Sequence, residues 1–337
     1  MLAGWLQRHW FEQRRLSPAL WFLIPLSWLF ILLARLKKQN TVPVSLPVPV
    51  IVVGNITVGG AGKTPLTIWL ARQLVKRGWR PGIVSRGYGG SNIEAREVSL
   101  DASPAEVGDE PVLLARRSGV PVWVGRDRAA VAKAMLQADP AVNMVLCDDG
   151  LQHYRLGRDV ELAVFDGRGA GNGWRLPVGP LREALSRLNS VDAVVCNGQA
   201  ELALPSAILK FDMSLRAEAF YRLGDPAQTC VAGDLARKKL AGKKMFALAG
   251  IGDPGRFFRT LEGLGLDFEA HPFPDHHAYC QSDLAFADAG ILLLTEKDAV
   301  KCAGLTLGEA WVLPVEAELS PALIDHILEK IRGRKVA

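Results

Sequence analysis

The sequence predicts an α/β protein built on a doubly wound, mostly parallel sheet. Short apolar, β-branched segments alternate with helical segments along most of the chain. A glycine-rich loop follows the first of these segments and opens a helix. The length of 337 residues allows two domains. We therefore expect a second, smaller α/β domain, and the apolar N-terminal segment adds a membrane-associated helix.

Composition and charge exclude several classes of protein. Hydrophobic residues make up 49% and charged residues 22% of the chain, which excludes disordered and fibrous proteins. The five cysteines are scattered and form no C-x-x-C pair, so we expect a reducing compartment and neither disulfides nor a cysteine zinc site. Residues 1–38 contain six Lys and Arg residues and one acid, Glu12, which equals the whole net charge of +5. This local excess argues against a nucleic-acid partner.

The N-terminal segment is predicted to meet a membrane. Residues 18–34 are almost all apolar, at the lower limit of length for spanning a bilayer, with Pro25 inside them and basic residues on both sides. Residues 4–16 are typical of a basic amphipathic helix. No small-residue cleavage site follows the apolar segment, which argues against a cleaved signal peptide. A buried core helix stays open as an alternative. We expect residues 1–38 to form a membrane anchor, shallow rather than spanning.

The remaining elements follow in order. After a proline-marked connector, residues 39–205 are predicted to form the nucleotide-binding α/β domain, with a helix at 65–77 and strands at 48–53, 82–85, 120–124, 144–147, 162–165 and 193–196. Residues 206–240 are predicted to be an extended two-stranded linker, with a hairpin of residues 207–212 and 217–223. The smaller C-terminal domain, residues 241–337, is predicted to contain strands at 245–249, near Phe268, at 290–294 and at 311–315, and helices at 255–264 and 321–332.

The glycine-rich loop predicts a phosphate-binding site. Its backbone N–H groups and the helix N-terminus favour an anion, Lys63 is placed to reach the β- and γ-phosphates, and the Thr64 hydroxyl is placed to bind Mg²⁺. The standard P-loop has glycine at the position of Thr57, so this loop is closer to the G-G-x-G-K-[ST] variant. That variant has a lysine directly before its two glycines, where this chain has Val58. A glycine-rich turn with an incidental G-K-T is the alternative. The candidate nucleotide-binding residues are Thr57, Gly59, Gly60, Ala61, Gly62, Lys63 and Thr64.

Two acids follow the predicted strand at 144–147. A P-loop NTPase needs a carboxylate near Mg²⁺ at a strand end, and Asp148 and Asp149 supply it. The candidate metal-binding residues are therefore Thr64, Asp148 and Asp149, with Asp148 the better candidate for direct or water-mediated contact. A solvated pair of acids in a turn is the alternative.

Phosphoryl transfer also needs a group that takes the proton of the acceptor. Asp109, in G-D-E-P at 108–111, is a candidate, although an acid that only caps a helix has the same pattern. His276, in the proline-braced P-D-H-H at 274–277, fits a carboxylate–imidazole pair. The segment at 295–298, T-E-K-D, superficially resembles a guanine-reading motif, but its Lys and Asp are adjacent, so it does not favour GTP over ATP. Arginines in loops are candidates for phosphate contacts, although each alone is more often a surface residue: Arg86, Arg126, Arg128, Arg155, Arg158, Arg168 and Arg182.

These motifs, taken in order, resemble those of the tetraacyldisaccharide 4′-kinases of Gram-negative bacteria. The resemblance extends from the N-terminal segment to about residue 301, and Ala184 departs from it where proline is expected. The motifs that carry it are V-G-N-I-T at 53–57, G-G-A-G-K-T-P at 59–65, S-R-G-Y-G at 85–89, G-D-E-P at 108–111, V-G-R-D-R at 124–128, D-D-G-L-Q-H at 148–153, N-G at 172–173, L-P-V-G-P-L-R-E at 176–183, F-P-D-H-H at 273–277 and T-E-K-D-A-V-K at 295–301.

The resemblance implies a P-loop NTPase-like kinase that uses ATP and Mg²⁺. It implies phosphorylation of the 4′-hydroxyl of an acylated glucosamine disaccharide 1-phosphate, giving lipid IV-A in lipid A biosynthesis, at the cytoplasmic face of the bacterial inner membrane. Asp109 is then the base or the acid that orients the acceptor hydroxyl, His276 is its partner, and Lys63 is the catalytic lysine of the P-loop. Weaker candidates for substrate contacts are Glu110, Arg86, Arg126, Arg128 and Arg182. No obligate protein partner is implied.

Two other classes of protein stay open at this point. The main alternative is a membrane-associated switch or assembly NTPase with a deviant P-loop, in which hydrolysis drives a conformational change without a small-molecule acceptor. The second is a nucleotide-gated membrane adaptor without catalysis. The first leaves the Asp-His-His loop at 275–277 and the hydrophobic N-terminus unexplained, and the second needs no base, so a requirement for Asp109 and His276 in turnover would count against it.

Overall fold

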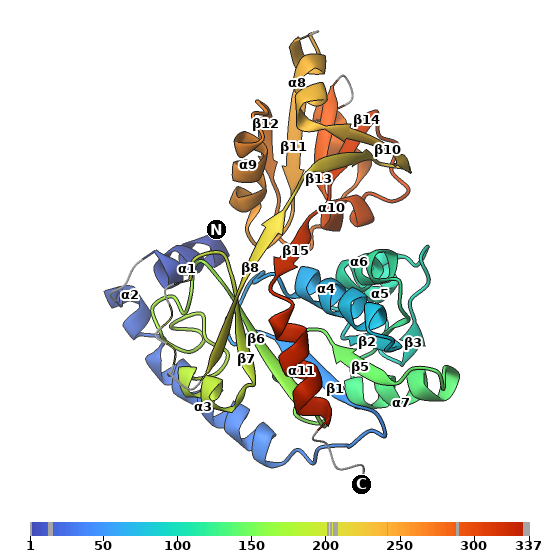
Figure 1. Ribbon diagram of the computed structural model, residues 1–337. Coiled ribbons are helices and arrows are strands. Elements are labelled where there is room, and N and C mark those ends of the chain that lie inside the picture. The colour runs from blue at the N-terminus through green and yellow to red at the C-terminus, as the bar shows by residue number, and fades with distance from the viewer. Residues whose placement is uncertain are drawn as a thin grey trace.

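The computed structural model describes residues 2–12, 16–200, 202, 204, 208–240, 242–287 and 290–332. Within these residues the chain forms a nine-stranded and a six-stranded sheet, each flanked by helices (Figure 1). Both sheets are mainly parallel, so the predicted α/β class is confirmed.

The nine-stranded sheet has the order β15-β8-β7-β6-β1-β5-β2-β4-β3 and is parallel except for its edge strands β15 and β3. Its strands are β1 (Val50–Gly54), β2 (Pro81–Ser85), β3 (Arg96–Glu97), β4 (Val122–Val124), β5 (Met144–Cys147), β6 (Val160–Asp166), β7 (Ala193–Asn197), β8 (Leu209–Arg216) and β15 (Glu316–Leu319). Val52 of β1 lies opposite Cys147 of β5. This register brings the glycine-rich loop and the Asp148–Asp149 pair to the same edge of the sheet.

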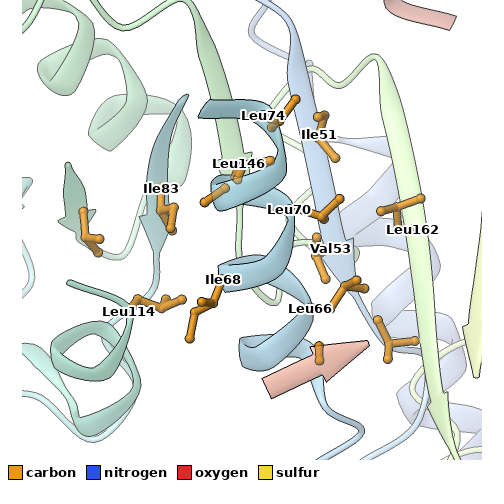
Figure 2. Close-up of a cluster of buried hydrophobic side chains, with 14 of the residues drawn as sticks. Ile51, Val53, Leu66, Ile68, Leu70, Leu74, Ile83, Leu114, Leu146 and Leu162 are labelled. Carbon is orange, nitrogen blue, oxygen red and sulfur yellow. The ribbon is translucent and has the colours of Figure 1, made fainter. Parts of the chain in front are cut away.

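Helices cover both faces of this sheet. They are α4 (Lys63–Lys76), α5 (Pro104–Val107), α6 (Asp109–Ser118), α7 (Arg128–Ala138), the 3₁₀ helix η1 (Leu185–Ser190) and α11 (Ala322–Arg332). On one face, Leu66, Leu70 and Leu74 follow each other at helical spacing along α4 and are fully buried. Figure 2 shows them facing Ile51 and Leu146 of the central strands. The core of the opposite face contains residues of α7 and η1.

The six-stranded sheet has the order β10-β9-β14-β13-β11-β12. Its elements are β9 (Ala219–Arg222), β10 (Asp225–Val231), α8 (Ala232–Leu240), β11 (Met245–Ala249), α9 (Pro254–Gly263), β12 (Glu269–Pro272), the 3₁₀ helix η2 (Gln281–Ala287), β13 (Ile291–Thr295), α10 (Glu296–Lys301) and β14 (Glu309–Leu313). Strands β12, β11, β13 and β14 are parallel, and β9 and β10 add an antiparallel hairpin at one edge.

The predicted hairpin of residues 207–212 and 217–223 is wrong in its pairing. Strand β8 pairs with β7 and β15 in the first sheet, whereas β9 pairs with β10 and β14 in the second. Near its end the chain returns, so that β15 and α11 pack on the first sheet (Figure 1). The strand patterns were correct, but a pattern does not specify which edge a strand joins. The predicted boundary at 205–206 and residue 207 lie outside the described residues.

The N-terminal segment forms three helices: α1 (Leu2–Phe11), α2 (Pro18–Trp21) and α3 (Ile24–Gln39). The apolar segment at 18–34 is therefore divided, and Pro25 lies in the first turn of α3, where its missing N–H removes no helical hydrogen bond. Within the described part of the chain, no helix has both the length and the apolar character needed to cross a membrane. The amphipathic helix predicted at 4–16 ends at Phe11, and residues 13–15 lie outside the described residues.

The last turn of α4 offers a test of the core. Leu74→Ala should lower the free energy of unfolding by about 2–5 kcal/mol, because it removes buried methyl groups and leaves a cavity. Val75→Ala on the same turn is the matched control, since Val75 is 48% exposed. Denaturant titration of both variants in detergent provides the measurement. Equal losses in the two variants would contradict the packing in Figure 2.

Candidate active site

A cavity of about 1700 Å³ lies between the two sheets. Residues that follow β1, β5 and β6 of the first sheet line it, and so do residues that follow β11 and β13 of the second. The carboxyl ends of parallel strands are the usual place for ligands in α/β proteins. Helix α3 closes part of the wall with Phe30, Leu33 and Lys37.

The glycine-rich loop forms one wall of the cavity, with all six residues from Gly59 to Thr64 in the lining. Gly59 and Gly62 have φ values of 100° and 95°, which favour glycine. A Cβ on Gly62 would lie only 2.6 Å from the side-chain nitrogen of Asn197. Thr57 lies elsewhere: it is buried, pairs with Leu181 through the backbone and is not part of the lining.

Lys63 opens α4 and points toward Asp149. Its Nζ lies 3.3 Å from an Asp149 carboxylate oxygen and donates to Asn55 Oδ1 at 3.3 Å. Arg182 donates to both carboxylate oxygens of Asp149 at 3.3 Å. Burial would raise the pKa of Asp149, but Lys63, Arg182 and Arg128 outweigh it and hold this pKa at about 2.

Asp148 differs sharply from its neighbour. It is 1% exposed, accepts a hydrogen bond from Thr67 Oγ1 at 3.1 Å and does not line the cavity. Burial, with the charges of Glu110 and Asp149 added, raises the pKa of Asp148 to about 7. Of the predicted metal-binding residues, Thr64 and Asp149 therefore reach the cavity, and Asp148 lies behind them.

Asp109 and His276 come together from the two sheets. The Nδ1 atom of His276 lies 3.1 and 3.0 Å from the two carboxylate oxygens of Asp109. Asp109, in the first turn of α6, is 4% exposed, whereas His276 lines the cavity and packs on the ring of Tyr88 with centroids 4.9 Å apart. Burial raises the pKa of Asp109, but the hydrogen bond to His276 and the charge of Lys297 outweigh it, so this pKa is lowered.

The candidate substrate residues Glu110, Arg86, Arg126, Arg128 and Arg182 all line the cavity. Arg128 is buried and donates to the carbonyl oxygen of Asp149 at 2.9 Å, so it holds the Asp148–Asp149 turn in place. Arg182 also contacts Gln152 Oε1 at 3.3 Å. Arg86 and Arg126 are exposed on the wall of the cavity.

Comparison with known proteins decides the family. The family model described as LpxK, tetraacyldisaccharide-1-P 4′-kinase, matches residues 19–332. A protein of Dechloromonas aromatica named tetraacyldisaccharide 4′-kinase is 67% identical over 100% of both chains. One of Methylobacillus flagellatus with the same name is 48% identical over 98% of this chain and 96% of its own. The chain belongs to the tetraacyldisaccharide 4′-kinase family.

A solved structure agrees with this assignment. LpxK from Aquifex aeolicus, crystallised in complex with ATP, is 29% identical, and the superposition covers 93% of this chain and 99% of that one with a TM-score of 0.77. The kinase described here is ATP-dependent, and the prediction of its family is confirmed.

The structure places Lys297, which the sequence patterns alone did not indicate, in the kinase site. Lys297 lies in the first turn of α10 and lines the cavity. Its Nζ is 3.1 Å from carboxylate oxygens of both Glu110 and Asp275. The sequence held a usable signal, because the T-E-K-D segment follows directly on a predicted parallel strand, where site residues gather.

A second cluster lies beside the glycine-rich loop, and of its members the sequence had indicated only Arg168. Asp166, at the end of β6, is 5% exposed and pairs with Arg168 at 2.6 Å and with Arg256 of α9 at 3.3 Å. The ion pair of Asp166 with Arg256 connects β6 of the first sheet to α9, which packs on the second sheet, beside the glycine-rich loop.

The lowered pKa of Asp109 predicts how stability depends on pH. Its contribution is fully present above the ordinary value of 3.8 and is lost as the pH falls from there toward the lower folded pKa. The difference in free energy of unfolding between the wild type and Asp109→Asn should therefore shrink as the pH falls below about 4. Denaturant titrations across this range test it, and a difference that grows with acid would contradict the arrangement.

Proposed function

We propose that this kinase transfers the γ-phosphate of ATP directly to the 4′-hydroxyl of tetraacyldisaccharide 1-phosphate, forming lipid IV-A. One observation carries the proposal: a single cavity is lined both by the phosphate-binding loop with Lys63 and by His276, whose Nδ1 contacts the buried carboxylate of Asp109 directly behind the wall. Phosphoryl transfer needs these two components, one for the donor and one for the acceptor.

The donor end consists of backbone N–H groups, Lys63 and the start of α4. These groups favour an anion, and Lys63 exchanges its contact with Asp149 for the phosphates when ATP binds. Oxygen atoms of Thr64 and Asp149 at the cavity wall, with buried Asp148 behind them, are the donors that Mg²⁺ prefers when it is shared with phosphates. Mg²⁺ would neutralise charge on the phosphates as they react. Among the described residues, no cluster of three His, Cys, Asp or Glu residues forms a separate metal site.

The acceptor end consists of Asp109 and His276. Because the pKa of Asp109 is lowered, its carboxylate is ionised at neutral pH and can accept the hydroxyl proton. In the transfer, the O–H bond of the acceptor breaks and the proton moves to Asp109. The acceptor oxygen forms a bond to the γ-phosphorus, and the bond from phosphorus to the bridging oxygen breaks to release ADP.

The N-terminal helices support a lipid substrate at a membrane surface. Helices α2 and α3 are held on the protein by buried Leu20 and by Ser27, which donates to the carbonyl oxygen of Arg175 at 3.2 Å. Their other side exposes large apolar side chains: Trp21, Phe22, Leu26, Trp28, Leu29, Leu32, Leu33 and Leu36. Such a continuous exposed apolar surface is typical of a membrane contact.

Helix α3 connects this apolar surface to the cavity, because Leu33 is exposed and Phe30, Leu33 and Lys37 line the cavity wall. We therefore place the kinase peripherally on the cytoplasmic face of the inner membrane, with acyl chains along α3 and the sugar headgroup near Asp109.

The proposed base is tested by Asp109→Asn, which should lower kcat by about 10²–10⁴ while ATP affinity is kept. Asp101→Asn is the matched control, because Asp101 is an exposed acid outside the cavity lining. Transfer of label from γ-labelled ATP to the disaccharide lipid, followed by chromatography, measures turnover, and nucleotide titration measures affinity. Robust ATP hydrolysis by the wild type without labelled lipid would favour a switch NTPase instead.

The membrane contact is tested by Trp21→Ser with Trp28→Ser. The two Trp side chains are 63% and 65% exposed. The variant should reduce partitioning onto anionic lipid vesicles by about tenfold or more, because two large apolar groups lose their contact with lipid. Leu100→Ser, which removes an apolar side chain 64% exposed elsewhere on the protein, should change partitioning little. Flotation of the full-length protein on vesicles distinguishes the two outcomes.

A further inference from the structure

We propose that Arg256 is a catalytic residue: from the half of the chain that forms the second sheet, it donates to the phosphates of ATP and stabilises the charge that the transfer moves onto ADP. This inference rests on the proposed function, because it assigns a group that acts while the γ-phosphorus changes partners. Arg256 takes no part in proton transfer, since a guanidinium keeps its protons in proteins.

The start of α9 brings Arg256 to the glycine-rich loop. Asp253 caps this helix and accepts from the backbone N–H of Arg256 at 3.2 Å, which places Arg256 in the first turn, and Arg256 lines the cavity. The loop between β11 and α9 touches the glycine-rich loop, because a Cβ on Gly252 would lie 3.1 Å from the backbone nitrogen of Gly60. Arg256 therefore reaches the cavity beside the phosphate-binding wall.

The glycine-rich loop lacks a cation at this point. The G-G-x-G-K-[ST] variant has a lysine directly before its two glycines, but this chain has Val58, whose backbone N–H donates to the carbonyl oxygen of Pro180 at 2.9 Å. Gly59 and Gly60 belong to the backbone that cradles the β- and γ-phosphates in a P-loop. A positive charge brought to these two glycines from another part of the chain takes the place of the missing lysine.

Two arginines lie beside these glycines, and they share the buried carboxylate of Asp166. Arg168 is committed to it: its Nε donates to the two carboxylate oxygens at 3.1 and 3.0 Å and its Nη2 donates to Oδ2 at 2.6 Å. The guanidinium of Arg168 also lies 4.5 Å from the centre of the Phe11 ring. Arg168 is therefore fixed as part of the wall.

Arg256 has donors to spare. A single nitrogen, Nη2, contacts Asp166 at 3.3 Å, and the side chain is 34% exposed. Within the part of the chain that the structure describes, Asp166 is the only acid paired with this guanidinium. An arginine has five N–H donors in a planar fork, so Arg256 can hold Asp166 with one edge and a phosphate oxygen with another.

The direction in which charge moves requires such a group. When the bond between the γ-phosphorus and the bridging oxygen breaks, its electron pair stays on that oxygen, and ADP gains the negative charge. The acceptor oxygen bonds to the γ-phosphorus, and its proton goes to Asp109. A fixed donor aimed at the charge that develops lowers the barrier more than it strengthens the binding of the substrate. Lys63 supplies one cation at the helix end of the loop, and Arg256 supplies a second at the glycines.

The experiment compares two ligands that need no lipid. Full-length protein in detergent with Mg²⁺ is titrated with ADP alone and with ADP plus aluminium fluoride, which mimics the transferred phosphoryl group. We expect the wild type to prefer the mimic. Arg256→Gln should weaken binding of the mimic by about 10²–10³-fold and binding of ADP by less than about threefold. Equal changes in both affinities, no change in either, or a wild type without the preference overturns the proposal.

Two further variants separate catalysis from a structural role. Arg256→Lys keeps the charge and one donor for Asp166, so the free energy of unfolding should stay that of the wild type. Its affinity for the mimic should remain at least about tenfold below the wild type, because lysine lacks the planar fork. Wild-type affinity in Arg256→Lys would reduce Arg256 to an ion pair between the sheets. Arg237→Gln, which removes an arginine of α8 that is 79% exposed and outside the cavity lining, should change none of these values.

Turnover is measured separately. With γ-labelled ATP and the disaccharide lipid, Arg256→Gln should lower kcat by about 10²–10³-fold with little change in the KM for ATP. An unchanged kcat overturns the role of Arg256. If the wild type labels no lipid, the proposed function fails, whereas the titrations with ADP and aluminium fluoride still decide the role of Arg256.

Discussion

The contact between α6 and α10 is the constraint on which the site depends. Helix α6 carries Asp109 and Glu110 and packs with the first sheet, whereas α10 carries Lys297 and follows β13 of the second. Ion pairs join the two helices at both ends of the contact: Lys297 with Glu110 at 3.1 Å, and Arg117 with Glu296. Because His276 also belongs to the second sheet's half of the chain, only this docking brings imidazole and carboxylate together.

Charge is divided across the cavity in a way that suits phosphoryl transfer. The wall beside the glycine-rich loop holds Lys63 and Arg182 around Asp149, so it is ready for a polyanion. The opposite wall holds Lys297 between the carboxylates of Glu110 and Asp275, with the buried carboxylate of Asp109 behind them. The neighbours Asp148 and Asp149 illustrate how strongly position matters. Both are buried enough for desolvation to raise their pKa values, but only Asp149 has cations close enough to reverse the effect.

Local features of this protein were predictable from its sequence, and long-range partners were not. The strand–loop–helix order around Lys63 follows from glycines and apolar periodicity, and the order of motifs identified Asp109 and His276. Whether β8 joins the first sheet or pairs with β9 depends on contacts far apart in the chain. The same limit applies to Lys297, since its ion pair with Glu110 forms only once α10 meets α6. Thr57 stands at a motif position, yet its backbone pairing with Leu181 directs it away from the cavity.

Helix α3 links the chemistry of the site to the proposed membrane position. A helix that only anchored the protein would need no contact with the cavity, and a core helix would not expose Trp28 and Leu32 to solvent. Helix α3 does both, since Phe30 and Lys37 line the cavity while the opposite side is apolar and exposed. Contact with a polar cavity and an exposed apolar side are both useful on one helix if the substrate has one part in the bilayer and another part in water. An acylated disaccharide does so, because its chains favour the bilayer while its hydroxyl and phosphate groups require a polar site. In the proposed arrangement, α3 therefore sets the depth at which the acceptor hydroxyl approaches the site of Asp109 and His276.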